Sequence, residues 1–436
     1  MKIHAMILTG IVSFFLLAAV PPAQANNVTV TNVSLVNADT TNGTIDVEFD
    51  VTWDHGFSGT DGNGQTFYDR AWVFVKYWVV GTDTESTGWH HATLTTGGSL
   101  TPAGAGMGVF AGKGADQTVR WDYREDGVGD SATVKVTACA IEMVFIPQGQ
   151  FVYNASGTGG TLYNNYGGGS QTTVSAASHV PTGASTGWPN GYNAFWVARY
   201  EVSQGQYSDF LNLLDISNAS TRFPNQSAYG HTITYTGGNP YGSRYAASSP
   251  DRACNYLSWD DAKAYLSWCG MRPLTEMEFE KAGRGGGTGT SVYPWGDTSP
   301  STTTYTVEGG VHTEYFANYD VTGATGDKPL AVGHYLSGDV TRTNEETGAS
   351  PYGVTDLGGN VWEHLINCEA TTTPEHGDGT IAPPASWPAA ASGKGIRGGC
   401  WYNVASLLRV SDRGNAGWTG TGRGSDVGVR PARTNE

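Results

Sequence analysis

A glycine-rich phrase near the C-terminal end constrains the fold of this chain most. Residues 352–363 hold three glycines, one tryptophan and two carboxylates. Glycine permits backbone conformations that other residues avoid, and a tryptophan ring needs a core to pack against. The phrase therefore predicts a tight turn that leads into a strand. A second phrase of this kind, residues 397–401, contains two glycines, a cysteine and a tryptophan.

The composition favours a loop-rich β architecture over a helical bundle. The 436 residues include 61 glycines and 14 tryptophans but only 24 lysines and arginines. A chain of this length predicts two or three domains with substantial cores. Its net charge of -16 would repel a polyanion before any local contact formed. We therefore expect neither nucleic acid nor an anionic membrane as a partner.

The first 25 residues have the pattern of a secretory signal peptide. Lys2 precedes an apolar run at residues 5–20, and the small residues at 23–25 fit a cleavage site. The run is short for a spanning helix, which needs roughly 20 residues, and no later segment is long and apolar enough to span. We expect a secreted or cell-surface protein, with the periplasm as a further compartment, and no transmembrane segment. An odd number of cysteines in an exported chain leaves at least one thiol unpaired; the five are Cys139, Cys254, Cys269, Cys368 and Cys400.

Short β-prone runs fill residues 26–139. Apolar and polar residues alternate at 28–36, 45–51 and 133–136, which predicts strands. Residues 71–80 are almost continuously apolar, so they predict the core strand of this unit. No helical period of useful length occurs here. We predict an N-terminal all-β sandwich of the immunoglobulin or fibronectin type, joined by only a few residues to a second domain at 140–436.

Three helices are expected in the second domain. Ser203 precedes apolar residues at helical spacing. Ser258 with Asp261, and Thr275 with Glu278, each form the pair of a capping box. The glutamates of the third helix are expected to complement the helix dipole rather than to catalyse acid–base chemistry.

Several phrases in this second domain together resemble the sulfatase-modifying-factor superfamily, the group that contains the formylglycine-generating enzyme. They lie, in order, at residues 141–151, 195–203, 257–270, 272–280, 293–297, 328–333, 352–363, 397–401 and 428–431. The resemblance implies that residues 140–436 form an α+β, C-type lectin-like domain of the formylglycine-generating-enzyme type.

The resemblance also implies a structural calcium ion at the turn of residues 352–363. In the family, the positions of Asp356, Gly359, Val361 and Glu363 supply both side-chain and main-chain oxygens. Calcium prefers roughly six to eight oxygen ligands, and two carboxylates on one bent turn would otherwise repel each other. An alternative stays open, in which Asp356 caps the turn and Glu363 pairs with an arginine such as Arg397.

A further calcium site is implied less completely. In the family it begins at an asparagine that matches Asn318, followed by the main-chain carbonyl at the position of Tyr319. The acidic partner of that site does not align cleanly, because Asp327 lies in a shorter insertion.

The resemblance supplies a test for catalysis as well. In the formylglycine-generating enzyme, an Arg-Gly-Gly-Ser-Trp phrase is followed by two cysteines that bind copper(I) and oxidise a substrate cysteine. Here Cys400 replaces the serine, and the two cysteine positions are Asn403 and Leu408. Because copper(I) prefers soft thiolate ligands, the sequence predicts a non-catalytic protein. A copper- or iron-dependent oxidase acting on thiols stays the alternative, although the H-x3-H-x-E run of the iron-binding branch is missing.

The loop after Cys400 predicts a ligand-binding rim. Its positions show no single periodicity, and they resemble the variable region of diversity-generating retroelement targets, which use the same lectin-like fold. Loops on a rigid scaffold often carry binding residues. The rim residues are Tyr402, Asn403, Val404, Ser406, Leu407, Val410 and Asp412. We expect an exported binding or surface-display protein whose partner is a protein or glycan, or which associates with itself in an extracellular assembly or filament.

Overall fold

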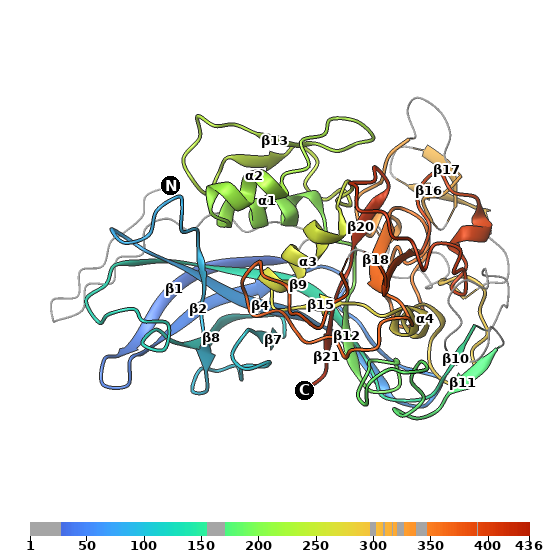
Figure 1. Ribbon diagram of the computed structural model, residues 1–436, viewed down its shortest axis with the longest axis horizontal. Coiled ribbons are helices and arrows are strands. Elements are labelled where there is room, and N and C mark those ends of the chain that lie inside the picture. Colours follow the sequence, from blue (N-terminus) through green and yellow to red (C-terminus); the bar gives the residue numbers. More distant parts are fainter. Residues whose placement is uncertain are drawn as a thin grey trace.

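The computed structural model describes residues 28–154, 171–296, 302–307, 310–315, 317–320, 327–336, 347–389 and 391–436 (Figure 1). The predicted signal peptide at residues 1–25 lies outside this range and stays a prediction. The described chain is mostly strand and irregular loop, with four α-helices. None of the described helices is both long and apolar enough to cross a bilayer.

One long antiparallel pair of strands runs through the molecule. β4 (Thr66–Val79) and β9 (Val134–Ile146) pair along almost their whole lengths, from Tyr68 opposite Phe145 to Val79 opposite Val134. β9 also pairs with β12 (Phe195–Ala198), which pairs with β21 (Pro431–Thr434), so the sheet continues into the C-terminal half (Figure 1). The predicted joint at residues 139–140 falls inside β9. It is a strand shared by both predicted domains and not a linker between them.

A four-stranded sheet covers one face of this pair. Its strands follow the order β1 (Thr29–Asp39), β2 (Thr44–Thr52), β8 (Gly114–Asp122) and β6 (Leu94–Thr95). Val73 and Val75 of β4 belong to the core that β4 shares with this sheet. Trp72 and Phe74 belong to the other core, with the helices. Both faces of β4 are buried, which explains why residues 71–80 are almost continuously apolar. The immunoglobulin or fibronectin type of this layered arrangement stays a prediction.

Three helices begin where the sequence predicts. Ser203 caps α1 (Gln204–Leu213), Ser258 caps α3 (Trp259–Trp268) and Thr275 caps α4 (Glu276–Arg284), each within a capping box. These predictions are confirmed. They succeed because each capping bond joins residues three positions apart, so the local sequence alone determines it. The sequence analysis missed a further helix, α2 (Ile216–Arg222), which Asp215 caps.

The glycine-rich phrase forms the predicted turn and strand. Asp356 and Asn360 both have φ of 58° and Gly359 has φ of 91°, and the chain then enters β18 (Trp362–Ile366). β18 lies between β19 (Lys394–Arg397) and β20 (Val427–Val429). This three-stranded sheet places the phrases at residues 352–363, 397–401 and 428–431 side by side.

The remaining strands are short. The sheet that contains β4 and β9 has eight strands, and β3 and β15 lie at its two ends. Two further short strands, β5 and β7, pair with β4, and the remaining short strands form separate two-stranded sheets. In chain order, all of these short strands are β3 (Ser58–Thr60), β5 (His90–His91), β7 (Val109–Ala111), β10 (Phe151–Tyr153), β11 (Thr172–Val174), β13 (Ile233–Tyr235), β14 (Tyr245–Ala247), β15 (Arg272–Pro273), β16 (Thr302–Val307) and β17 (Gly310–Tyr315).

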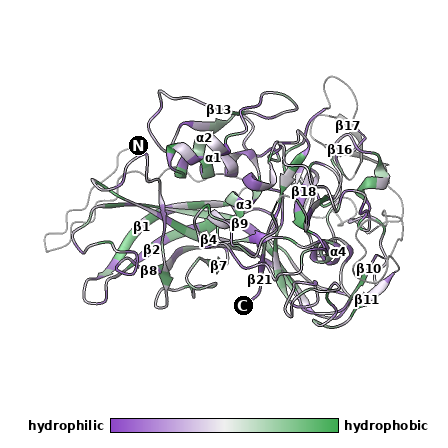
Figure 2. Ribbon diagram, viewed as in Figure 1, coloured by the Kyte–Doolittle hydropathy of each residue, from purple (hydrophilic) through white to green (hydrophobic). Residues whose placement is uncertain are grey.

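α4 is hydrophilic in sequence and yet entirely buried (Figure 2). Its glutamates are ion-pair partners rather than solvated first-turn charges. Glu280 pairs with Arg284 at 3.2 Å, with Arg397 at 3.3 Å and with Arg413. Glu276 accepts hydrogen bonds from Arg397 Nη1 at 3.0 Å and from Arg413 Nε at 3.3 Å. We call these two glutamates and three arginines the α4 ion network.

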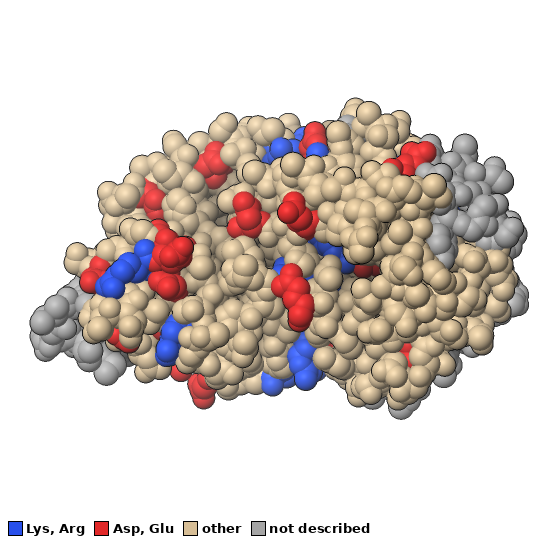
Figure 3. Space-filling model, turned by 60° about the horizontal axis from the view of Figure 1, so that its bottom comes forward, with Lys and Arg blue, Asp and Glu red and all other residues tan. Residues whose placement is uncertain are grey.

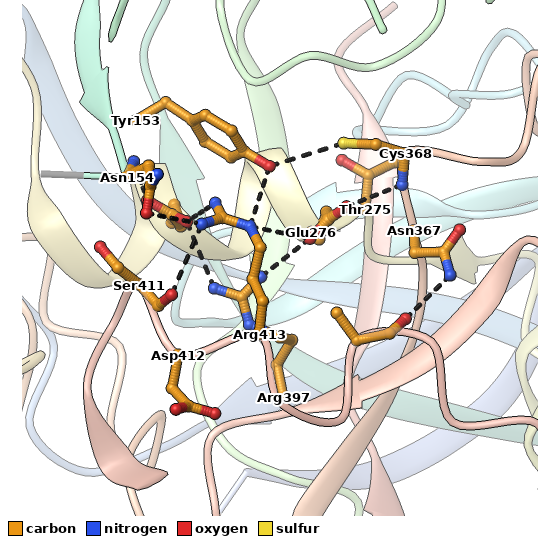
Figure 4. A network of polar contacts seen from close by, with 12 residues as sticks. Tyr153, Asn154, Thr275, Glu276, Asn367, Cys368, Arg397, Ser411, Asp412 and Arg413 are labelled. Atoms are coloured by element: carbon orange, nitrogen blue, oxygen red, sulfur yellow. Dashed lines mark hydrogen bonds and ion pairs between the residues drawn. The ribbon is translucent and has the colours of Figure 1, made fainter. Parts of the chain in front are cut away.

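Arg413 ties this network to β10. Figure 4 shows its guanidinium between Tyr153, Asn154 and Glu276. Arg413 Nε donates to the Tyr153 hydroxyl at 3.1 Å, and Arg413 Nη1 donates to Asn154 Oδ1 at 2.9 Å. A buried charge needs a full set of partners to offset its desolvation. The arrangement therefore fixes α4, β10 and the 410–413 segment to one another.

Candidate functional site

The turn of residues 356–361 contacts a buried cluster of acidic side chains. Glu363 pairs with Arg430, whose Nε lies 2.9 Å and 3.0 Å from the two carboxylate oxygens and whose Nη2 lies 2.5 Å from Oε1. Asp356 Oδ2 accepts from the main-chain N–H of Gly333 at 2.6 Å. The arginine partner of Glu363 is thus Arg430, whereas Arg397 belongs to the α4 ion network.

Asn360 joins this turn to the segment of the other predicted calcium site. Its main-chain N–H donates to the carbonyl of Asn318 at 2.9 Å. Its side-chain oxygen accepts from Asn318 Nδ2 at 3.1 Å and from the N–H of Leu330 at 2.8 Å, while its Nδ2 donates to Glu201 Oε2 at 2.5 Å. The structure therefore brings Asn318, and Tyr319 beside it, directly against the turn of Asp356.

Glu201 is a site residue that the sequence analysis missed. Burial raises the pKa of Glu201 well above its ordinary value, and the nearby charges of Asp356 and Glu363 raise it further. Burial likewise raises the pKa of Asp356 and of Glu363, and Arg430 partly opposes both shifts. Three carboxyl groups thus share one arginine. No sequence spacing indicated this, because Glu201 comes from the segment between β12 and α1.

These groups could serve a cation only with help from the main chain. Among the described residues, no group of three His, Cys, Asp or Glu side chains lies close enough together to hold a metal ion. A calcium ion at this turn would need the predicted main-chain oxygens of Gly359 and Val361 beside the side chains of Asp356 and Glu363. Calcium therefore stays a prediction.

In the phrase at residues 397–401, the thiol of Cys400 is held by a hydrogen bond. Asn403 Oδ1 accepts from the main-chain N–H of Cys400 at 2.9 Å and from the Cys400 thiol at 3.1 Å. Asp426 Oδ2 lies 3.9 Å from the same sulfur. Burial, followed by the Asp426 charge, raises the pKa of the Cys400 thiol. These surroundings favour the neutral thiol of Cys400, whereas the thiolate is the form that acts as nucleophile and metal ligand.

The two positions that carry copper-binding cysteines in the related enzyme have other functions here. Asn403 caps Cys400, and Leu408 is fully buried beside Tyr293 and Trp295. None of the five cysteines, all of which lie in the described part of the chain, forms a disulfide, and burial raises the pKa of each thiol. The described site thus holds no pair of thiolates in the positions that the chemistry needs.

The predicted rim is only partly a surface. Tyr402 is 46% exposed and Val404 is 56% exposed, and Ser406 is exposed as well. Val410 and Asp412 are buried, so they are not part of the exposed surface, and their assignment to a ligand-binding rim stays a prediction. Val410 packs against α4, since a Cβ on Gly283 would lie 3.3 Å from it.

Two other predicted rim residues are half-buried. Leu407 packs against the core cluster around Trp401, and the Asn403 side chain is occupied by Cys400. The exposed surface that remains, Tyr402, Val404 and Ser406, we call the rim.

An aromatic neighbour extends the rim beyond the predicted loop. Tyr229 is 49% exposed, and its ring centroid lies 6.3 Å from that of Trp401. Tyr402 packs edge-on against Trp401 and donates to Asp426 Oδ2 at 2.6 Å. Tyr229 lies far from this loop in sequence, and no pattern in the sequence indicated that it would reach the loop.

Comparison with known proteins agrees with these motifs. The family described as the sulfatase-modifying factor enzyme 1-like domain matches residues 130–435. The inactive C-alpha-formylglycine-generating enzyme 2 of Mus musculus is 36% identical over 138 residues, which are 32% of this chain and 38% of that protein. The hercynine oxygenase of Mycobacterium tuberculosis is 26% identical over 247 residues, which are 50% of this chain and 48% of that protein. The chain thus spans less than half the length of either relative.

Among solved structures, PvdO from Pseudomonas aeruginosa is similar at a TM-score of 0.38 and 19% identity, over 68% of this chain and 95% of that one. The region that matches the family domain begins just before β9 and reaches almost to the C-terminal end of the chain. It includes every phrase on which the predicted resemblance depends. The chain belongs to the sulfatase-modifying factor family.

Proposed function

We propose that this protein is an exported, non-catalytic member of its family that uses the rim to bind a protein or glycan partner. The observation that carries the proposal is the state of Cys400. Its thiol is buried, it is capped by Asn403, and the other position at which the related enzyme has a copper ligand is the core residue Leu408. The similarity to a relative named as inactive supports the same function.

The alternative is a copper- or iron-dependent oxidase acting on thiols, since hercynine oxygenases and formylglycine-generating enzymes are also similar. Purified protein loaded with copper(I), or with iron(II), and given a cysteine-containing peptide tests it. We expect no aldehyde and no sulfoxide product. Product formation above the level of a Cys400→Ser variant would overturn the non-catalytic proposal.

Self-association by strand addition is the less favoured form of the binding proposal. The end strands of the eight-stranded sheet, β3 and β15, have three and two residues, and β15 contains Pro273. β1 is longer, but its register shifts twice, and Asn32 and Asn37 have positive φ of 54° and 52°. Short, bulged or proline-containing edges oppose pairing with another chain. Size-exclusion chromatography is expected to give a monomer.

The rim predicts a binding defect without a folding defect. A Tyr402→Ser, Val404→Ser variant should keep its melting temperature and bind about tenfold or more weakly, because exposed aromatic side chains often dominate binding. Fluorescently labelled protein applied to a glycan array and to displayed peptides measures this. The matched control is Tyr235→Ser with Val80→Ser, since these side chains are 46% and 41% exposed elsewhere. Equal signals from the two variants would rule the rim out.

We also propose that calcium stabilises the turn of Asp356 and Glu363. Burial raises the pKa of both carboxyl groups, so the folded state binds their protons more tightly than the unfolded chain does. Ion-free protein should therefore lose stability as the pH rises above the ordinary carboxyl range. Calcium at about a hundred times its dissociation constant should raise the melting temperature by about 5 °C at neutral pH, and less in acid.

The Asp356→Asn variant, measured by calorimetry with calcium and with chelator, tests this proposal. Asparagine keeps an oxygen for the N–H of Gly333 but removes the charge. The calcium-dependent rise should disappear in the variant. If native protein melts at the same temperature with calcium as with chelator, no calcium ion binds at this turn.

A further inference from the structure

A groove of about 420 Å³ lies where the N-terminal part of the chain meets the family domain. One wall comes from the turn between β3 and β4, and the others come from the segments that follow β9, that follow β11 and that precede β12. The lining residues are Asn63, Gln65, Gln148, Gly149, Gln150, Ser175 and Tyr192. The first two lie outside the matched family domain at 130–435, so the family domain alone would lack this wall.

The base of the groove is fixed by hydrogen bonds. Asn63 Nδ2 donates to the carbonyl of Gln150 at 2.9 Å, and the N–H of Gly149 donates to the carbonyl of Tyr192 at 2.9 Å. The turn that carries Asn63 packs closely on the loop after α4, since a Cβ on Gly62 would lie 2.5 Å from the carbonyl oxygen of Gly286. The walls are therefore held in place before any ligand arrives, which lowers the entropy cost of binding.

The described residues that line the groove are polar, and none of them is charged. Gln65, Gln148 and Gln150 are exposed, and no hydrogen bond from their side-chain amides to another described residue is present. Two charged side chains that bond to segments beside the groove, Lys281 and Asp61, are engaged with the protein. Lys281 Nζ donates to the carbonyl of Pro147 at 2.6 Å, and Asp61 accepts from the hydroxyl of Tyr352 and the N–H of Asn63.

Charged atoms are also sparse among the described residues at the β10 and β11 end of the face in Figure 3. Figure 3 is turned from Figure 1 about the horizontal axis, so the end of the molecule that carries β10 and β11 stays on the right. That end shows almost no Lys, Arg, Asp or Glu atoms on this face. A ligand that approaches there meets little local field, although the chain as a whole is acidic.

We propose that this groove binds a neutral carbohydrate. Each carboxamide offers both donors and acceptors, as a sugar hydroxyl does, so amides from several segments can satisfy neighbouring hydroxyl groups. The Tyr192 ring adds an apolar surface with a polar tip. The volume lies within the range of small-molecule sites, roughly 300–1,000 Å³. A peptide is the weaker fit, because extended peptides usually pair with a free strand edge, and side chains of turns line this groove.

The test uses the full chain and three neutral probes, maltotriose, cellotriose and tri-N-acetylchitotriose, in saturation-transfer NMR and calorimetric titration. At least one probe should bind, and the Gln148→Leu, Gln150→Leu variant should bind it about tenfold more weakly, because two exposed amides lose their hydrogen bonds to the ligand. The matched control is Gln226→Leu, an exposed glutamine that does not line the groove, and it should bind as the native protein does.

Three results would overturn the proposal: no probe binds, the double variant binds as tightly as the native protein, or an uncharged hexapeptide competes with the sugar for the site. The melting temperature of the double variant should equal that of the native protein, since both side chains are exposed. The rim variant at Tyr402 and Val404 should keep its affinity for the sugar. Loss of sugar binding there would place the ligand at the rim and not in the groove.

Discussion

The Glu280→Ala variant is expected to lose about 3–5 kcal/mol of its free energy of unfolding, which is a large share of the stability of an ordinary domain. Glu280 is fully buried and is the shared partner of Arg284, Arg397 and Arg413. Without it, three guanidinium groups face the single carboxylate of Glu276. Unpaired buried charges are the costliest polar defect in a core.

Urea unfolding followed by tryptophan fluorescence measures this loss. Arg413→Met is the informative comparison, because it leaves two carboxylates beside two arginines, so we expect a smaller loss than for Glu280→Ala. Glu125→Ala serves as the control, since Glu125 is exposed and its removal should change stability by less than about 0.5 kcal/mol. A Glu280→Ala midpoint equal to that of the control would mean that the α4 ion network contributes nothing to stability.

The Arg430→Met variant should lose a similar amount, about 3–5 kcal/mol, with a loss that grows as the pH rises. Arg430 is the shared cation of Glu363, Asp356 and Glu201, and its charge opposes the burial that raises the pKa of these carboxyl groups. Removal of the cation raises their pKa further. The variant therefore keeps more stability in acid, where the carboxyl groups are protonated, and loses it as the pH rises through their raised pKa values.

Unfolding free energies at about pH 5 and about pH 8 give the measurement. Arg423→Met is the matched control, since Arg423 also bonds both oxygens of one buried carboxylate, Asp261, but its own side chain is 27% exposed and Arg222 lies 3.6 Å from the same carboxylate. Its loss should be smaller and nearly independent of pH. If Arg430→Met loses as much at the lower pH as at the higher one, the three carboxyl groups are not coupled through this arginine.

The local features of this fold could be read from the sequence. Ser203, Ser258 and Thr275 start their helices because a cap bonds to residues three positions away. The turn at Asp356 and the strand after it follow from glycine placement in the same way. The family phrases added the order of these elements along the chain.

Long-range pairing could not be read in this way. The runs at residues 133–136 and 141–151 were assigned to separate domains, whereas a single strand, β9, contains most of both. A β-prone pattern indicates a strand but not its partner, and the partner here, β4, lies far away in sequence. The buried charges of α4 were hidden for the same reason, because Arg397 and Arg413 come from distant segments.

The candidate site likewise combines local features that the sequence predicts with long-range contacts that it does not. The spacing of Asp356 and Glu363 placed both on one turn, but Glu201 joins them only through the fold. In the loop after Cys400, Val410 and Asp412 are buried, Val410 against Gly283 of α4. A mixed sequence does not distinguish a loop residue that faces solvent from one that is buried. Tyr229 reaches the rim through a tertiary contact with Trp401.

The shared strand β9 also limits how this architecture can be rearranged in evolution. An N-terminal module that hangs on a flexible tether can be exchanged or deleted with little effect on its neighbour. Here a replacement would have to supply a strand that matches β4 in length and register, because β9 would otherwise expose a long unpaired edge. The residues that precede the family domain and the family domain at 130–435 are therefore expected to have been inherited together, as one piece.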